Sequence, residues 1–452
     1  MTADPRHGAS GPRRGWLEER LGGQLFGGFL NRNVPDETGL PHTLGSATLF
    51  LLVVQVATGI VLGMNYVPSP EHAYDSIEFI MSQVLLGPIL RGLHHWGSSA
   101  LVVVAGLHML RVFLWGSYKR PREVTWMAGV ALLLIVMGFA FTGYLLPWTQ
   151  RSYWATVVGT KIVGTVPGAG AWLLQVIRGE AGVGPVALAR FYAIHVLLLP
   201  ALLVPLVVLH LYLVYRHGIA PAPGNEAAAR KGKRFYPEQL AEDLGVSLLV
   251  LAVLFALTAW RGVPTEVRAD PASTTYVPRP EWYFLFFFQL LKYFEGPIWE
   301  PFGVIVLPLA AILLLFVIPL VDRRAERRPA RRPYAMVSAA AAVAVVAGLT
   351  YFGAVQVPPG TRTAPAGSSQ ALISRGHEVF VTNGCKNCHV VAGQGAEVGP
   401  ELTHVGSRLT ADRLAAQVRN PASVNPKTNM PAFDKLSGDD LKALVAYLLT
   451  LK

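Results

Sequence analysis

Charged residues are scarce in this chain. Only 15% of its 452 residues are charged and 52% are apolar, whereas a soluble domain usually carries about 25% charged residues. The scarcity argues against an ordinary soluble protein and indicates a membrane protein. Apolar runs approach the roughly 20 residues needed to cross a bilayer. The candidate spans are residues 45–65, 94–115, 126–146, 191–214, 244–260, 302–321 and 335–354.

Cysteine is almost absent, since Cys385 and Cys388 are the only two. This excludes a self-contained cysteine-ligated iron–sulfur cluster, because such a cluster needs more ligands than are spare here. A cleavable signal is not expected either, because the first 40 residues are polar and irregular. Export of the C-terminal part would then depend on the seventh span.

Acidic residues are outnumbered, and the net charge of +11 raises the possibility of a nucleic-acid partner. The basic residues instead lie in alternate loops, and Glu71, Asp75 and Glu78 fall in the first opposite loop. The basic clusters occupy 6–20, 119–122, 230–234 and 323–332. By the positive-inside rule the N-terminus is cytoplasmic and the C-terminal part lies outside. We therefore expect no nucleic-acid partner.

Histidines occur at membrane depth in two of the spans. His94 and His108 lie on the second span, and His195 and His210 on the fourth. Fourteen helical residues rise about 21 Å and end within roughly 40° of the starting direction, whereas fifteen end about 60° away. Polar residues at this depth are usually functional, and two stacked haem irons with axial imidazoles fit the layout. Both spans run inward, which pairs His94 with His195 on the outer side and His108 with His210 on the inner side. Interhelical hydrogen bonding is the alternative.

Glycines repeat the same interval. Gly45 and Gly59 lie 14 residues apart on the first span, and Gly129 and Gly143 lie 14 apart on the third. Small residues permit close approach, so these positions could admit the edge of a flat macrocycle. Ordinary helix packing would explain them equally.

Two arginines flank the histidines. Arg91 and Arg111 could pair with haem propionates, or they could extend to the lipid headgroups.

A covalent haem site is predicted in the tail. Cys385, Cys388 and His389 form the motif CxxCH, typical of c-type haem attachment; a zinc or disulfide pair is the alternative. Met430 is the expected second axial ligand and His404 its competitor. A thioether ligand raises the haem potential relative to a second histidine.

Several segments resemble a known family. They are GLHHWGSSALVVVAGLHMLRVF, PREVTWMAGV, FTGYLLPWTQRSYW and RFYAIHVLLLP. They are similar to cytochrome b of quinol-oxidising cytochrome bc complexes, and nearer to the chloroplast type because His195 and His210 are 15 apart. Residues 235–354, with Pro280-Glu281-Trp282-Tyr283, resemble its subunit IV. The context of Met430 resembles that of small class I cytochromes c.

The resemblance implies an all-α fold: a seven-helix membrane bundle with a four-helix di-haem core and three further helices, followed by a small soluble helical cytochrome c domain. The implied parts are a cytoplasmic segment 1–40, a four-helix domain 41–220, a three-helix domain 221–356, a linker 357–369 and a cytochrome c domain 370–452.

The resemblance also implies a quinol site. Glu281 would take a proton from quinol, and Pro280, Trp282 and Tyr283 would help to form the site. Alternatively, these four residues merely begin a loop helix with interfacial aromatics. The chloroplast-type protein carries an extra haem on a cysteine; the matching residue here is Thr43. We therefore expect no covalent third haem in the membrane part.

The implied activity is that of a quinol–cytochrome c reductase subunit in the plasma membrane. Its cofactors would be two non-covalent haems b and one covalent haem c, with quinol and quinone as substrates. Its implied partners are a separate Rieske iron–sulfur protein, the quinone pool, a downstream cytochrome c or terminal oxidase, and a second copy in a homodimer. The alternatives are a non-catalytic di-haem electron relay and a transporter.

Overall fold

A computed structural model of the chain describes residues 31–35, 39–224, 232–264, 266–271, 279–294, 296, 299–355, 369–391, 393, 396, 398–426, 428 and 430–451. The predicted linker 357–369 lies outside these residues except for Ser369, as does most of the predicted segment 1–40. Two compact units form, one from residues 1–269 and 279–354 and the other from 270–278 and 355–452. Each unit is described by itself.

The first unit is a bundle of membrane-length helices. Within the described residues, seven helices are long and apolar enough to cross a membrane, which confirms the predicted seven-span bundle. They are Leu40–Gly63 (α3), Gly87–Leu114 (α5), Glu123–Leu145 (α6), Pro185–His217 (α9, η1 and α10), Phe235–Arg261 (η3 and α11), Trp299–Val321 (α13, η5 and α14) and Pro333–Val355 (α15). The fifth helix is longer than its apolar run 244–260 suggests.

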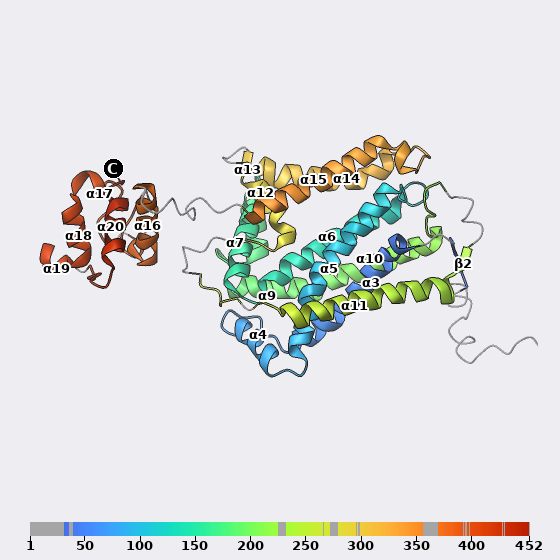
Figure 1. The fold of residues 1–452 in the computed structure, drawn as a ribbon, viewed down its shortest axis with the longest axis horizontal. Helices are drawn as coiled ribbons and strands as arrows, with labels where there is room; N and C mark the ends of the chain where they lie inside the picture. Colours follow the sequence, from blue (N-terminus) through green and yellow to red (C-terminus); the bar gives the residue numbers. More distant parts are fainter. Residues whose placement is uncertain are drawn as a thin grey trace, which may run out of the picture. The chain divides into compact units, whose positions relative to one another are not determined.

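Packing within the bundle brings together helices that are distant in the chain. α3 packs on α5, α6 on α10, and α11 on both α3 and α5, and these helices run side by side in Figure 1. Leu51, Leu93, Leu101, Val136 and Leu254 form a small buried core between them. The helices are apolar on nearly every side, as expected where the remaining surface faces lipid.

Short elements close the two ends of the bundle. At one end lie Gln150–Gly164 (α7), Trp282–Phe284 (η4) and Leu285–Leu291 (α12); we name this the Glu281 end. Thr149 and Ser152 cap α7 reciprocally, which is a strong helix-start signal. At the other end, which we name the Arg111 end, Asn33–Pro35 (β1) pairs antiparallel with Gly232–Arg234 (β2). Figure 1 shows α7 and β2 at opposite ends.

An ionic cluster joins two loops at the Arg111 end. Lys119 Nζ and Arg332 Nη2 donate to Asp322 at 2.8 and 3.1 Å, and the Tyr118 hydroxyl donates to the same carboxylate at 2.5 Å. Burial alone would raise the pKa of Asp322, but the hydrogen bonds and charges of its partners lower it overall. The cluster therefore ties the loop after α5 to the segment between α14 and α15.

The fourth span contains a local irregularity at a predicted site residue. Pro185–Ala193 (α9) and Leu199–His217 (α10) are joined by a π-helical turn, Ile194–Leu198 (η1), in which the Leu199 N–H donates to the Ile194 carbonyl. Pro200 follows and has no N–H to donate, so it removes one α-type hydrogen bond beside the turn. His195 lies inside the π turn, a feature often found at functional sites.

The second unit is a small helical domain. Its elements are Ser369–Thr382 (α16), Cys385–Asn387 (η7), Val405–Arg408 (α17), Ala411–Arg419 (α18), Pro421–Val424 (α19) and Gly438–Leu448 (α20). α16 packs on α20, and a side chain on Gly376 would overlap the Ala443 carbonyl. Leu441, Leu444 and Leu448 are buried. The last helix of this domain therefore packs on its first.

Candidate functional site

Two histidine rings lie close together near the Glu281 end. His94 is in the second turn of α5 and His195 is in the π turn, and the two rings are within electrostatic range of each other. Each ring lies against a glycine of a neighbouring helix. A Cβ on Gly59 would be 3.1 Å from His94 Cε1, and one on Gly143 would be 2.5 Å from His195 Cε1. A side chain on Gly143 would therefore overlap His195, and one on Gly59 would require the His94 ring to move by a few tenths of an ångström.

The second pair of rings repeats this arrangement nearer the Arg111 end. His108 on α5 and His210 on α10 are also within electrostatic range of each other. A Cβ on Gly45 would be 3.2 Å from His108 Cε1, and one on Gly129 would be 3.4 Å from His210 Cε1. The structure thus brings the four histidines together in the two pairs that their spacing predicts, each beside a predicted glycine.

The π turn explains why unequal spacings give matching pairs. His195 and His210 are 15 residues apart, whereas His94 and His108 are 14 apart on a regular helix. A π turn accommodates one extra residue per turn. The fourth span therefore presents its two rings with nearly the rotation that 14 regular residues would give.

A carboxylate site lies in the loops of the Glu281 end. Arg151 Nη1, from the start of α7, is 3.5 Å from a Glu281 carboxylate oxygen and 3.4 Å from one of Glu266. The side chain of Glu281 is 18% exposed. Burial raises the pKa of Glu281, and the adjacent guanidinium of Arg151 partly opposes this.

The other residues of the Pro280–Tyr283 motif differ in their burial and hydrogen bonds. Arg151 Nη2 donates to the Pro280 carbonyl at 3.3 Å. Tyr283 is buried, and burial raises the pKa of its hydroxyl. Trp282 is more exposed, and its indole N–H donates to Ser99 Oγ at 3.4 Å. Glu281 precedes the short helix η4 and accepts the Phe284 N–H through its carbonyl.

The CxxCH segment of the second unit forms a compact turn. Its histidine, His389, places Nδ1 2.7 Å from the Pro400 carbonyl, so Nδ1 donates and Nε2 keeps a free lone pair. A Cβ on Gly399 would be 2.6 Å from His389 Cε1. Burial raises the pKa of the Cys385 thiol to about 11, while Cys388 is exposed.

Met430 and His404 differ in their surroundings. Met430 packs against the buried core of the domain, and its sulfur is 3.9 Å from Gln417 Nε2. His404 is exposed at the start of α17. Of the two predicted candidates, Met430 is therefore the one that packs against the interior of the domain.

Known proteins match this chain along most of its length. The model described as "Cytochrome b/b6/petB" matches residues 29–218, "Cytochrome b(C-terminal)/b6/petD" matches 268–369, and "Cytochrome c" matches 373–452. A cytochrome bc complex cytochrome b subunit from Chlorobaculum thiosulfatiphilum is 36% identical over 324 residues, which cover 69% of this chain and 74% of that one. The chain belongs to the cytochrome b family of cytochrome bc complexes. Its C-terminal part is a fused cytochrome c domain.

Further relatives agree with this cytochrome b assignment. The menaquinol:cytochrome c reductase cytochrome b subunit of Geobacillus thermodenitrificans is 40% identical, covering 45% of this chain and 96% of its own. Cytochrome b6 of Heliobacterium mobile is also 40% identical, covering 45% and 98%. A solved structure, "Hyperthermophilic respiratory Complex III", matches with a TM-score of 0.69 and 28% identity over 76% of this chain and 92% of that one.

The residues around the histidines fit the haems that such domains bind. Each ring lies against a glycine, whose lack of a side chain makes room for the imidazole. Among the described residues, Arg91 Nη1 and Arg111 Nε are buried without a hydrogen-bond partner, and buried groups of this kind are normally satisfied. Haem propionates would satisfy both arginines. Thr43, at the position of the family's extra cysteine, donates its hydroxyl to the Leu40 carbonyl at 2.8 Å.

Four residues of the site were not predicted from sequence. Arg151 and Glu266 meet across 115 residues of chain, and no local pattern indicates that contact. Thr58 and Thr142 could have been found from the sequence, because each directly precedes one of the glycines spaced 14 residues apart. Their hydroxyls lie 3.0 and 3.1 Å from Nδ1 of His94 and His195.

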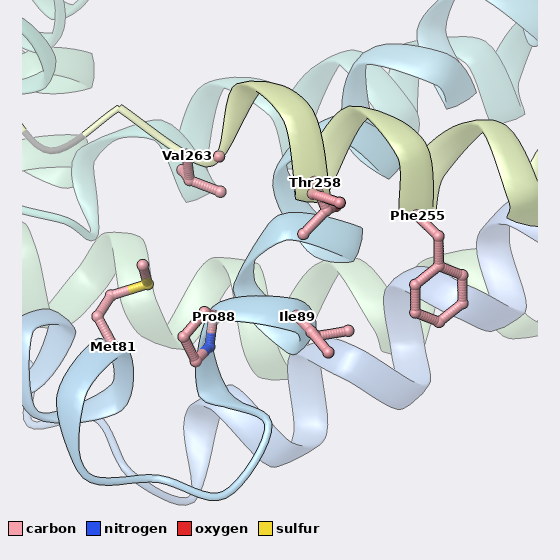
Figure 2. A pocket seen from close by; sticks show the side chains of 8 residues that line it. Met81, Pro88, Ile89, Phe255, Thr258 and Val263 are labelled. Atoms are coloured by element: carbon pink, nitrogen blue, oxygen red, sulfur yellow. The ribbon is translucent and has the colours of Figure 1, made fainter.

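An apolar crevice lies near the start of α5 and the end of α11. Figure 2 shows the side chains that line its volume of about 270 Å³. They belong to Met81, Pro88, Ile89, Phe255, Thr258, Ala259, Gly262 and Val263. None of them is charged, so the crevice offers contact to an apolar chain but no group that could take a proton.

Proposed function

We propose that this cytochrome b is the redox-active subunit of a quinol–cytochrome c reductase and oxidises quinol at the Glu281 end. The observation that carries the proposal is the position of Glu281, a half-buried carboxylate beside Arg151, at the same end as the His94–His195 pair. Quinol oxidation releases two protons and two electrons. A proton acceptor and an adjacent one-electron acceptor are therefore needed together.

Glu281 is suited to accept one of these protons. Burial raises its pKa, which makes the carboxylate more basic than one at the surface, and Arg151 limits that rise. A general base works best when its pKa lies near the operating pH. Glu266 shares Arg151 and is about one-third exposed, so it offers a route by which the proton could leave towards water.

The histidines would hold the cofactors. His94 with His195, and His108 with His210, would each provide two imidazole ligands for a haem b. Cys385 and Cys388 would form the thioether bonds of haem c, whose iron would be ligated by His389 and Met430. When bound, these groups would supply one-electron transfer across the membrane and on its outer side.

Net turnover would use both ends of the bundle. One electron from each of two quinols would together reduce one quinone at the Arg111 end, and the other electron from each quinol would leave towards the cytochrome c domain. Proton release at the Glu281 end and uptake at the Arg111 end would contribute to the proton motive force. By the positive-inside rule, the basic loops favour a cytoplasmic Arg111 end. The Glu281 end and the cytochrome c domain would then lie on the outer side of the plasma membrane.

The proposal requires further subunits. Both cysteines of the chain belong to CxxCH, so an iron–sulfur centre that accepts the outgoing electron must belong to a separate Rieske protein. Fusion keeps the cytochrome c domain at a high effective concentration near that partner. A downstream cytochrome c or terminal oxidase would receive the electron, and the complex would be a homodimer.

Glu281→Gln tests this proposal. The amide cannot accept a proton, so quinol oxidation should fall about 100-fold, a typical contribution of a general base, while both b haem signals persist. The measurement is quinol-dependent reduction of the haems in the purified complex. Glu71→Gln, which changes an exposed acid of another loop, is the matched control. Unchanged quinol oxidation in Glu281→Gln would favour the alternative of a non-catalytic di-haem relay.

A further inference from the structure

The two histidine pairs differ in the residues that precede their glycines. At the Glu281 end these residues are Thr58 and Thr142. At the Arg111 end they are Leu44 and Ala128. The hydroxyl groups of Thr58 and Thr142 therefore stand beside one pair of rings, whereas the equivalent two positions beside the other pair carry no hydroxyl.

Each threonine hydroxyl has one proton to donate, and the direction of its hydrogen bond with the histidine depends on where that proton goes. Thr58 Oγ1 donates to the Val54 carbonyl at 2.7 Å and lies 3.0 Å from His94 Nδ1. Thr142 Oγ1 donates to the carbonyl four residues earlier at 2.8 Å and lies 3.1 Å from His195 Nδ1. With each hydroxyl proton directed to its closer main-chain carbonyl, each ring donates to the hydroxyl oxygen through Nδ1–H. Nε2 of both rings then keeps its lone pair for iron.

The rings of the other pair lack such partners. Nδ1 of His108 and of His210 is buried without a hydrogen bond in the described part of the chain. The Thr125 carbonyl faces His210 but does not reach hydrogen-bond geometry. The carbonyls of Gln55 and Phe139 face His94 and His195 as well. Main-chain carbonyls thus lie near rings of both pairs, and the threonine hydroxyls lie near the rings of one pair in addition.

We propose that Thr58 and Thr142 are positioning residues that lower the reduction potential of the haem held by His94 and His195 relative to the other haem b. This inference rests on the proposed ligation by the four histidines. A hydrogen bond accepted from the outer nitrogen of an imidazole fixes its tautomer and makes it a more basic ligand. A more basic ligand stabilises ferric over ferrous iron, so the potential falls. Electron transfer from the Glu281 end towards the Arg111 end becomes more favourable.

Redox titration of the b haems in the purified complex tests this inference, with Thr58→Val and Thr142→Val as the variants. Valine has nearly the shape of threonine but accepts no hydrogen bond. Each variant should raise the midpoint potential of one haem b and leave the other unchanged. A tenfold change in the ferric-to-ferrous equilibrium of a one-electron couple corresponds to about 59 mV. The g-values of the same ferric haem should shift, which a purely structural role would not produce.

Two further variants make the result decisive. Thr58→Ser keeps the hydroxyl and should restore the wild-type potential. Ala128→Ser adds a hydroxyl at the equivalent place beside His210 and should lower the potential of the other haem. The inference is overturned if the valine variants leave the potential unchanged or raise both haems equally. Failure of the ligation itself would appear differently, as a His94→Leu complex that keeps both b haems.

Discussion

The two ends of the membrane bundle hold the same pair of histidines and glycines in different surroundings. At the Glu281 end the rings have hydroxyl partners, and the loops hold Arg151 between two carboxylates. At the Arg111 end Nδ1 of each ring has no hydrogen-bond partner among the residues that the structure describes, and the loops are joined by the cluster around Asp322. The repeated histidines and glycines are suited to holding two similar groups. The hydroxyls and the loop charges, which differ between the ends, give the two ends different chemistry.

The largest expected effect comes from removing a ligand at either end. His195→Leu and His108→Leu should each abolish one haem b signal, because an iron with one axial imidazole left is held weakly. The two variants should remove different haems and spare haem c, as measured by redox difference spectra. If both variants lost the same haem, the assignment of one haem to each end would be wrong.

Substitution by alanine should have unequal effects on haem binding at the two ends. A Cβ on Gly143 would be 2.5 Å from the His195 ring, whereas a Cβ on Gly129 would be at an ordinary contact distance of 3.4 Å from His210. Gly143→Ala should therefore displace His195 and lose most of one haem b, while Gly129→Ala keeps both. Haem content per polypeptide is the measurement. Equal loss in both variants would mean that the closer approach at Gly143 has no consequence.

The smallest expected effect is a change in pH dependence at the Glu281 end. Glu281 accepts a proton only when it is ionised, so quinol oxidation should rise as pH increases through its pKa. Arg151 lowers this pKa and Glu266 raises it. Arg151→Gln should therefore move the rise to higher pH, and Glu266→Gln should move it to lower pH.

The pH–rate profile of quinol oxidation measures these shifts, and Arg151→Lys, which keeps the positive charge, should shift the profile less than Arg151→Gln. If Arg151→Gln and Glu266→Gln moved the rise in rate in the same direction along the pH axis, Glu281 would not be the group that sets this pH dependence.

Much of the fold could be predicted because it depends on local sequence. Apolar length predicts a membrane helix, and all seven spans appear in the structure. The interval between His94 and His108 predicts a shared face because a regular helix relates residues 14 apart by simple rotation. The motif CxxCH predicts a covalent haem site because its two cysteines and its histidine lie within one turn of the chain.

The site could be predicted only in part. Regular helix geometry leaves His195 and His210 about 60° apart, and nothing local shows that Ile194–Leu198 forms the π turn that corrects this. Arg151 meets Glu281 across the packed loops of one end. That contact depends on where α7 and η4 come together, which neighbouring residues do not decide.

By itself, the sequence determined the membrane helices, the intervals of the histidines and glycines, and the motif of the cytochrome c domain. Each of these depends on distances along one helix or one turn. The tertiary structure alone decided that each glycine faces one particular histidine, that Thr58 and Thr142 serve a single pair, and that Arg151 stands between Glu266 and Glu281. These are contacts between segments far apart in the chain, and they exist only once the helices have packed.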